Sequence, residues 1–130
     1  MLYPDNWKLE EDEPNLSVTL ESPHGSFLQV TSCQDSLESD FKKVVEAMHE
    51  EYDDIETDAH DLSIDSELIE GITQRFVCLD MVVTSHLLKL SSDGQNFIVQ
   101  IQGEDRDMTK DSPIFEACLT SICQALQSGK

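Results

Sequence analysis

Residues 72–103 read ITQRFVCLDMVVTSHLLKLSSDGQNFIVQIQG and alternate between apolar and polar side chains over most of their length. Asp93-Gly94 predicts a two-residue hairpin loop, because a type I′ turn needs positive φ at both central residues, which glycine adopts freely and aspartate tolerates. One parity of the two arms predicts a core face: Leu88, Leu90, Phe97, Val99 and Ile101. The other parity predicts a solvent face: Lys89, Gln100 and Gln102. A third long strand is predicted upstream from apolar residues of a single parity: Val77, Leu79, Met81 and Val83.

One amphipathic helix is predicted before this segment and one after it. Residues 37–52 carry apolar side chains at helical spacing, and Asp35 with Glu38 three residues later forms a predicted capping box. Residues 113–126 show the same spacing. There Ser112 is the predicted N-cap and Pro113 takes the first helical position, where its missing N–H is not needed. Each helix is expected to cover one face of a sheet.

Shorter elements complete the predicted order. Residues 16–21 and 26–32 alternate in polarity around a turn at residues 22–25, and the acidic residues 50–70 have room for one or two edge strands. We therefore expect one α+β domain over residues 1–130, an antiparallel β-sheet flanked by two helices in the order β-β-α-β-β-β-β-α. Residues 1–15 are a polar lead-in, in which Trp7 is expected to close one end of the core.

Charge is the strongest compositional feature. The formal net charge is −19, and residues 1–70 carry 20 acidic and 3 basic residues, whereas residues 71–130 carry 7 and 5. Such a field repels phosphate groups, so nucleic acids and anionic membranes are not expected as partners. It favours a basic protein surface, although an acidic surface also serves solubility alone.

The cysteines indicate a reducing compartment. No Cys-x-x-Cys pair occurs among the four cysteines, which are Cys33, Cys78, Cys118 and Cys123. Three of them fall among apolar residues of predicted strands or helices. No stretch resembles a signal peptide or a membrane span. A soluble, cytoplasmic protein is therefore expected.

The order of elements resembles that of the Mog/PsbP-like superfamily, which includes DcrB-like domains. The resemblance runs from Trp7 through the two short strands and the first helix, then over the strands that Gly71 opens, to a last helix with Phe115, Leu119 and Ile122 on its stripe. It implies an α/β/α sandwich around an antiparallel sheet. It also implies a binding module and not an enzyme, and it transfers no functional residue.

The acidic segment, residues 50–70, is the sharpest candidate site. Its predicted partner-binding residues are Asp53, Asp54, Glu56, Asp58, Asp61 and Asp65. An EF-hand alignment from Asp54 puts Ala59 where glycine is needed and Asp65 where the bidentate glutamate is needed, so no calcium site is predicted. Complementary fields orient association with a basic protein, which makes docking a better interpretation of these charges than calcium binding. A merely solvated acidic connection is the leading alternative to both.

Other chemistry has little support in the sequence. No two histidines have the i, i+4 spacing of a metal site, and Gly-x-Ser-x-Gly and phosphate-binding glycine loops are absent. Cys78 and His86 are the only pairing that suggests a nucleophile and its base, and both fall in predicted core strands, where a thiol is inert. We expect no catalytic residue, no metal and no cofactor.

The sequence thus predicts a non-enzymatic binding module whose acidic face docks a basic protein. Two alternatives remain open. One is a small-molecule or metal-dependent enzyme with its site in a cleft between helix and sheet, and the other is an immunity- or chaperone-type protein that sequesters a cationic effector. The sequence predicts no oligomeric state.

Overall fold

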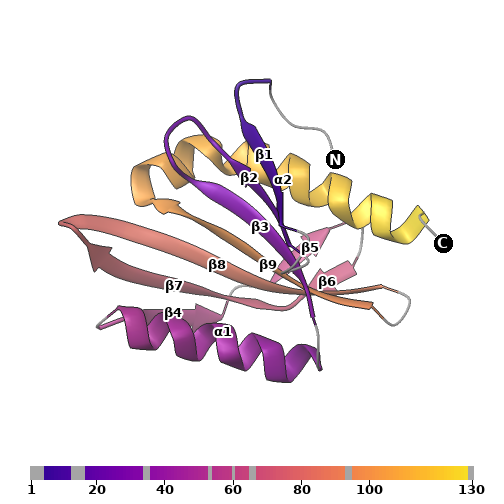
Figure 1. Cartoon of the computed structure of the whole chain (residues 1–130), viewed down its shortest axis with the longest axis horizontal. Helices are drawn as coiled ribbons and strands as arrows, with labels where there is room; N and C mark the ends of the chain where they lie inside the picture. Colours follow the sequence, from indigo (N-terminus) through magenta and orange to yellow (C-terminus); the bar gives the residue numbers. More distant parts are fainter. Residues whose placement is uncertain are drawn as a thin grey trace.

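The computed structural model describes residues 5–12, 17–33, 36–52, 54–59, 61–64, 67–92 and 95–128. Its elements follow the chain as β1 (Lys8–Asp12), β2 (Ser17–Glu21), β3 (Phe27–Ser32), α1 (Leu37–Glu51), β4 (Glu56–Ala59), β5 (Leu62–Ile64), β6 (Glu67–Ile69), β7 (Gly71–Cys78), β8 (Met81–Ser92), β9 (Gln95–Glu104) and α2 (Asp105–Ser128). Seven strands form one antiparallel sheet in the order β1-β2-β3-β9-β8-β7-β4, and β5 and β6 form a small hairpin (Figure 1). The predicted α+β class is confirmed. The structure adds β1 within the predicted lead-in and a third short strand within the acidic segment.

The two helices cover opposite faces of the sheet. Leu88 and Val99 face α2, in a cluster that includes Phe115 and also Trp7, whose ring meets that of Phe115 edge-on with 5.3 Å between centroids. Leu87 and Ile98, the neighbours of Leu88 and Val99 along the same strands, pack against α1. Central strands are therefore buried on both sides, and Trp7 closes the core as predicted.

The predicted solvent face is wrong, because α1 covers it. The Lys89 Nζ atom lies 4.7 Å above the centre of the Phe41 ring and 3.1 Å from a carboxylate oxygen of Glu38. Gln100 Nε2 donates to Gln102 Oε1 at 2.9 Å. Long polar side chains bury their stems while their polar ends find partners, so they do not by themselves mark a solvent-exposed face.

The start of α1 is as predicted, whereas α2 starts earlier in the chain than predicted. α1 starts at Leu37 as predicted, and its N-cap is Ser36, whose Oγ accepts the backbone N–H of Ser39 at 3.1 Å. Asp35, the predicted cap, lies outside the described residues. α2 starts at Asp105, directly after β9, so Pro113 is inside the helix and the predicted cap at Ser112 is wrong.

The predicted third strand is also wrong, because a tight turn divides it into β7 and β8. Cys78 pairs with Met81, and the two residues between them, Leu79 and Asp80, have φ values of 52° and 64°. Positive φ at both positions is the backbone of a type I′ turn, for which Asn-Gly is the preferred sequence. Leucine is unfavourable there, because its Cβ crowds the following carbonyl.

Replacing Leu79 with asparagine is expected to stabilise the protein. Asparagine tolerates positive φ, and the Leu79 side chain is 87% exposed, so little buried contact is lost. We expect the free energy of unfolding in urea to rise by about 1 kcal/mol.

Leu68→Asn is the matched control, because Leu68 is also exposed but lies within β6 and not in the turn. It is expected to gain nothing. An unchanged or lower stability of Leu79→Asn would contradict strain at the turn.

Candidate docking surface

The hairpin of β7 and β8 projects beyond the rest of the sheet. The ladder between β8 and β9 ends where Val83 pairs with Glu104, and the chain then turns directly into α2. Residues 77–82, called the hairpin tip below, therefore extend past the end of β9 (Figure 1). Four of its apolar side chains are exposed: Val77 at 66%, Leu79 at 87%, Met81 at 43% and Val82 at 48%.

A groove lies at the base of this tip. Strand β4 pairs with β7 only as far as Arg75, so the edge of β7 from Phe76 onward has no partner strand among the described residues. The Tyr52 ring at the end of α1 stacks on the Phe76 ring, with 4.1 Å between their centroids. The groove has a volume of about 560 Å³, and its lining comprises Glu51, Tyr52, Asp54, Glu56, Arg75, Phe76, Val77 and Val82.

Apolar and acidic side chains both line the groove. Three carboxylates, those of Glu51, Asp54 and Glu56, line it together with one guanidinium, that of Arg75. Asp80 adds another exposed acidic residue at the turn of the hairpin tip. Burial and the neighbouring Glu51 carboxylate raise the pKa of Tyr52, so its phenol stays neutral in this surrounding. We call this lined hollow the acidic groove.

The structure brings together only part of the predicted partner-binding set. Asp54 and Glu56 line the acidic groove, and Asp58 is exposed two residues further along β4. The Asp61 side chain instead stabilises the start of β7. Its Oδ1 atom accepts a hydrogen bond of 3.3 Å from the backbone N–H of Gly71. Asp53 and Asp65 lie outside the described residues.

The apolar half of the surface was missed at the sequence level. Val77, Leu79 and Met81 alternate as the inward side chains of a strand do, and the sequence predicts them on one parity of a single long strand. Strand length was the available signal, because residues 71–92 contain no internal glycine or proline yet exceed the usual strand of 3–10 residues. This length indicates a turn within them, and Asp80 is a turn-favouring residue near their middle.

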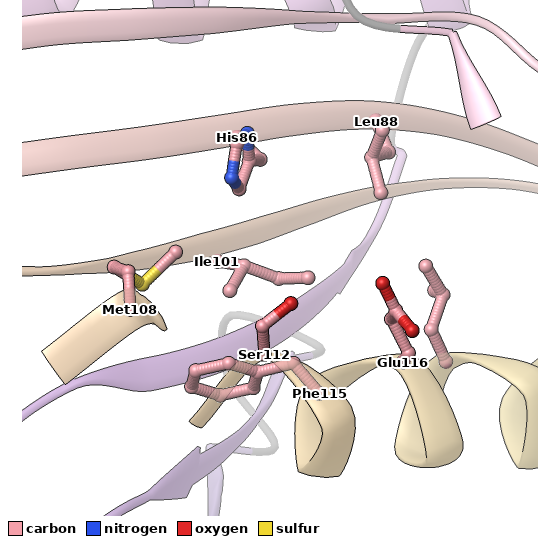
Figure 2. A pocket seen from close by; sticks show the side chains of 8 residues that line it. His86, Leu88, Ile101, Met108, Ser112, Phe115 and Glu116 are labelled. Carbon is pink, nitrogen blue, oxygen red and sulfur yellow. The ribbon is translucent and has the colours of Figure 1, made fainter. Parts of the chain in front are cut away.

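A second, smaller hollow lies between α2 and the sheet (Figure 2). Its volume is about 140 Å³, below the roughly 300–1,000 Å³ of pockets for drug-sized ligands. His86 lines it, and the Nδ1 atom of that ring is hydrogen-bonded to Thr73 Oγ1 at 2.8 Å. His86 pairs with Thr73, which lies five residues along β7 from Cys78. About 16 Å therefore separates Cys78 from His86, too far for the two to act as a nucleophile and its base.

The remaining cysteines and acids form no reactive or metal-binding group among the residues that the structure describes. Desolvation by burial raises the pKa of Cys118, and burial with the nearby Asp40 raises that of Cys33, so both remain thiols at neutral pH. No three His, Cys, Asp or Glu side chains converge as metal ligands in the described ranges. Neither described helix is apolar over a length sufficient to cross a bilayer.

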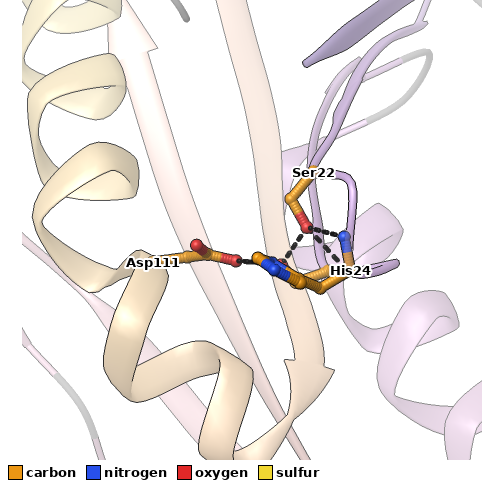
Figure 3. A network of polar contacts seen from close by, with 4 residues as sticks. Ser22, His24 and Asp111 are labelled. Atoms are coloured by element: carbon orange, nitrogen blue, oxygen red, sulfur yellow. Dashed lines mark hydrogen bonds and ion pairs between the residues drawn. The ribbon is translucent and has the colours of Figure 1, made fainter. Parts of the chain in front are cut away.

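A buried polar network ties the β2–β3 turn to α2 (Figure 3). Ser26 Oγ donates to Asp111 Oδ2 at 2.7 Å, and Ser22 Oγ lies 2.7 Å from Ser26 Oγ. The single Ser26 hydroxyl proton is used on Asp111, so Ser22 donates to Ser26 and accepts the backbone N–H groups of His24 and Ser26, each at 3.2 Å. Both serines are buried, which fits a structural connection and not a reactive hydroxyl.

Gly103 makes room for this connection. A Cβ atom on Gly103 would lie 2.5 Å from the Ser26 Cβ, closer than real Cβ atoms approach one another. The absence of a side chain at position 103 therefore lets the β2–β3 turn lie against β9 within reach of α2.

Comparison with solved structures gives the fold. The solution structure of cyanobacterial PsbP (CyanoP) from Synechocystis sp. PCC 6803 matches with a TM-score of 0.54 and 10% identity, over 88% of this chain and 79% of that one. A protein of unknown function, PA94 from Pseudomonas aeruginosa, matches with a TM-score of 0.58 and 8% identity, over 92% of this chain and 87% of that one. No family model and no curated protein matches the sequence. The chain has a PsbP-like fold, as the order of its elements predicted.

Replacing Asp111 tests the buried network. Asp111→Ala leaves Ser26 without its acceptor and removes a charge-assisted hydrogen bond, so we expect the free energy of unfolding to fall by about 2–3 kcal/mol. Asp107→Ala, on the same helix and outside this network, is the control and should cost well under half as much. Equal losses in the two variants, measured by urea unfolding, would show that the network adds no stability.

Proposed function

We propose that this protein is a non-catalytic binding module, and that the hairpin tip together with the acidic groove docks a basic protein partner. The observation that carries the proposal is the hairpin tip, where four apolar side chains are exposed on a turn that places a leucine at positive φ. A sequence free of other demands would place asparagine or glycine there. Strained backbone and exposed apolar surface in one place are features of binding sites.

Charge gives the chemistry of the partner. The carboxylates of Glu51, Asp54 and Glu56 flank apolar surface, so the complementary partner presents apolar side chains surrounded by Lys or Arg. A second copy of this chain would bring a net charge of −19 against another of −19 and place the carboxylates that line the two grooves against each other. Phosphate-rich partners are disfavoured for the same reason.

The apolar and acidic parts have different tasks. Exposed charge pairs contribute about 0–1 kcal/mol each, and they mainly speed and orient association. Complete burial of a leucine side chain contributes about 1.5–3 kcal/mol. We therefore assign the affinity mainly to the hairpin tip and the selection of a basic partner to the acidic groove.

We also propose that the protein works in a reducing compartment. Cys33, Cys78 and Cys118 form no disulfide in the described part of the chain, which supports a reducing environment such as the cytoplasm. A cationic effector that must be sequestered would use the same surface chemistry, and the identity of the captured partner separates that role from other docking roles.

Capture from a lysate of the source cells, with variants, tests this proposal. The immobilised protein should retain a basic protein at about 0.1 M salt and lose it at about 1 M, as the Debye length falls from about 10 Å to about 3 Å. Leu79→Asn should weaken retention of that same protein by about tenfold or more. Asp54→Asn with Glu56→Gln should weaken it by roughly 3- to 10-fold.

Two matched controls localise the effect. Leu68→Asn removes an exposed leucine outside the hairpin tip, and Glu11→Gln with Glu21→Gln removes two exposed charges at the opposite edge of the sheet. Both controls should retain the partner like the unmodified protein. Loss of the partner in the controls and not in the tip and groove variants, or no capture at either salt, contradicts the proposal.

A further inference from the structure

The hollow between α2 and the sheet has an apolar interior and a polar side. Leu88 on β8 and Ile101 on β9 face Phe115 and Leu119 on α2 across it, within a volume of about 140 Å³. Three polar side chains line it as well: His86, Ser112 and Glu116. Figure 2 shows His86 reaching in from the sheet, while Ser112 and Glu116 stand on consecutive turns of α2.

The polar residues on α2 interrupt its apolar stripe. Met108, Phe115 and Leu119 stand at i, i+7 and i+11 and are buried, and Ser112 and Glu116 occupy the i+4 and i+8 positions of that same stripe. An apolar side chain at 112 would fill the space that the small serine leaves open. Ser112 is half-buried and Glu116 is exposed, so Glu116 is the more accessible of the two to solvent.

The sheet side of the hollow is fixed in place. The hydrogen bond of 2.8 Å between Thr73 Oγ1 and His86 Nδ1 holds the imidazole ring against β7. Leu88 is fully buried, and Ile101 is 5% exposed. A ligand would therefore meet a preformed wall, which reduces the entropy lost on binding.

We infer that this hollow binds a small organic cation, an amine on an apolar body about the size of a benzene ring. A cavity of about 150 Å³ in another protein accepts benzene, which sets the size of the body. The Glu116 carboxylate attracts an ammonium group, and the Ser112 hydroxyl oxygen accepts a hydrogen bond from it. The net charge of −19 disfavours an anion of the same size. This site is separate from the acidic groove, and the inference does not depend on the proposed docking function.

Methyl NMR of the whole protein tests the inference with benzylamine, benzyl alcohol and benzoate as probes. Met108 lines the hollow, whereas Met48 is equally buried on α1, on the opposite side of the sheet, and serves as the internal reference. Benzylamine should shift the Met108 signal saturably and leave Met48 unchanged. Benzyl alcohol should need about three- to fivefold more ligand, because it lacks the charge pair with Glu116. Benzoate should not saturate.

Variants distinguish the contribution of the Glu116 charge from that of the open volume of the hollow. Glu116→Gln should weaken benzylamine about three- to fivefold, to the level of benzyl alcohol, while Glu50→Gln, which removes an exposed charge on α1, should change nothing. Ser112→Leu should abolish the response to both probes by filling the hollow. If Ser112→Leu disturbs the Met48 signal, and hence the fold, Leu119→Phe takes its place.

Three results would overturn the inference. The first is no saturable Met108 shift with benzylamine, which would make the hollow a closed packing defect. The second is a shift that survives in the filled variant, which would place the binding elsewhere. The third is benzoate binding as well as benzylamine, which would remove the role of Glu116.

Discussion

The ladder between β8 and β9 is the constraint on which the rest of the structure depends. These strands pair from Val83 with Glu104 to Ser92 with Gln95, and each then pairs outward, β8 with β7 and β9 with β3. Both of their faces are covered, which is why Leu87 and Leu88 are each fully buried. The ladder also fixes where β9 stops shielding the edge of β8. β9 passes into α2 at Asp105, whereas β7 and β8 extend beyond that point. The uncovered hairpin tip is a direct result of that difference in length.

Periodicity predicted the fold class and the first helix well, since alternation and 3.6-residue spacing are local properties. The position of α2 was not predictable in the same way, because Pro113 satisfies the rules for a first helical position whether or not a helix precedes it. The predicted core face of the central strands is confirmed, and only their solvent face was misassigned, for a different reason. Lys89 and Gln100 are polar, yet an amphipathic helix covers them, and local sequence does not reveal what packs on a strand from another part of the chain.

In the candidate site, too, the sequence revealed local properties and missed those that depend on the fold. Acidic residues such as Asp54 and Glu56 were found from composition, because charge density is visible without a structure. Val77 and Leu79 were missed because their exposure depends on where a distant strand ends. Asp61 shows the opposite error, since a carboxylate counted as part of a docking face accepts a backbone hydrogen bond at the start of β7. Exposure is thus a tertiary property that a sequence pattern indicates only in part.

Solvent contact of the hairpin tip in the free protein can be measured by methyl NMR with a soluble paramagnetic agent. We expect strong relaxation of the methyl groups of Val77, Leu79 and Val82, and little relaxation of those of the buried Leu88 and Val99. Protection of the hairpin tip at the level of the buried methyls would mean that another part of the chain or a second copy covers it. That result would contradict the central claim, that the end of β9 leaves an apolar surface open for a partner.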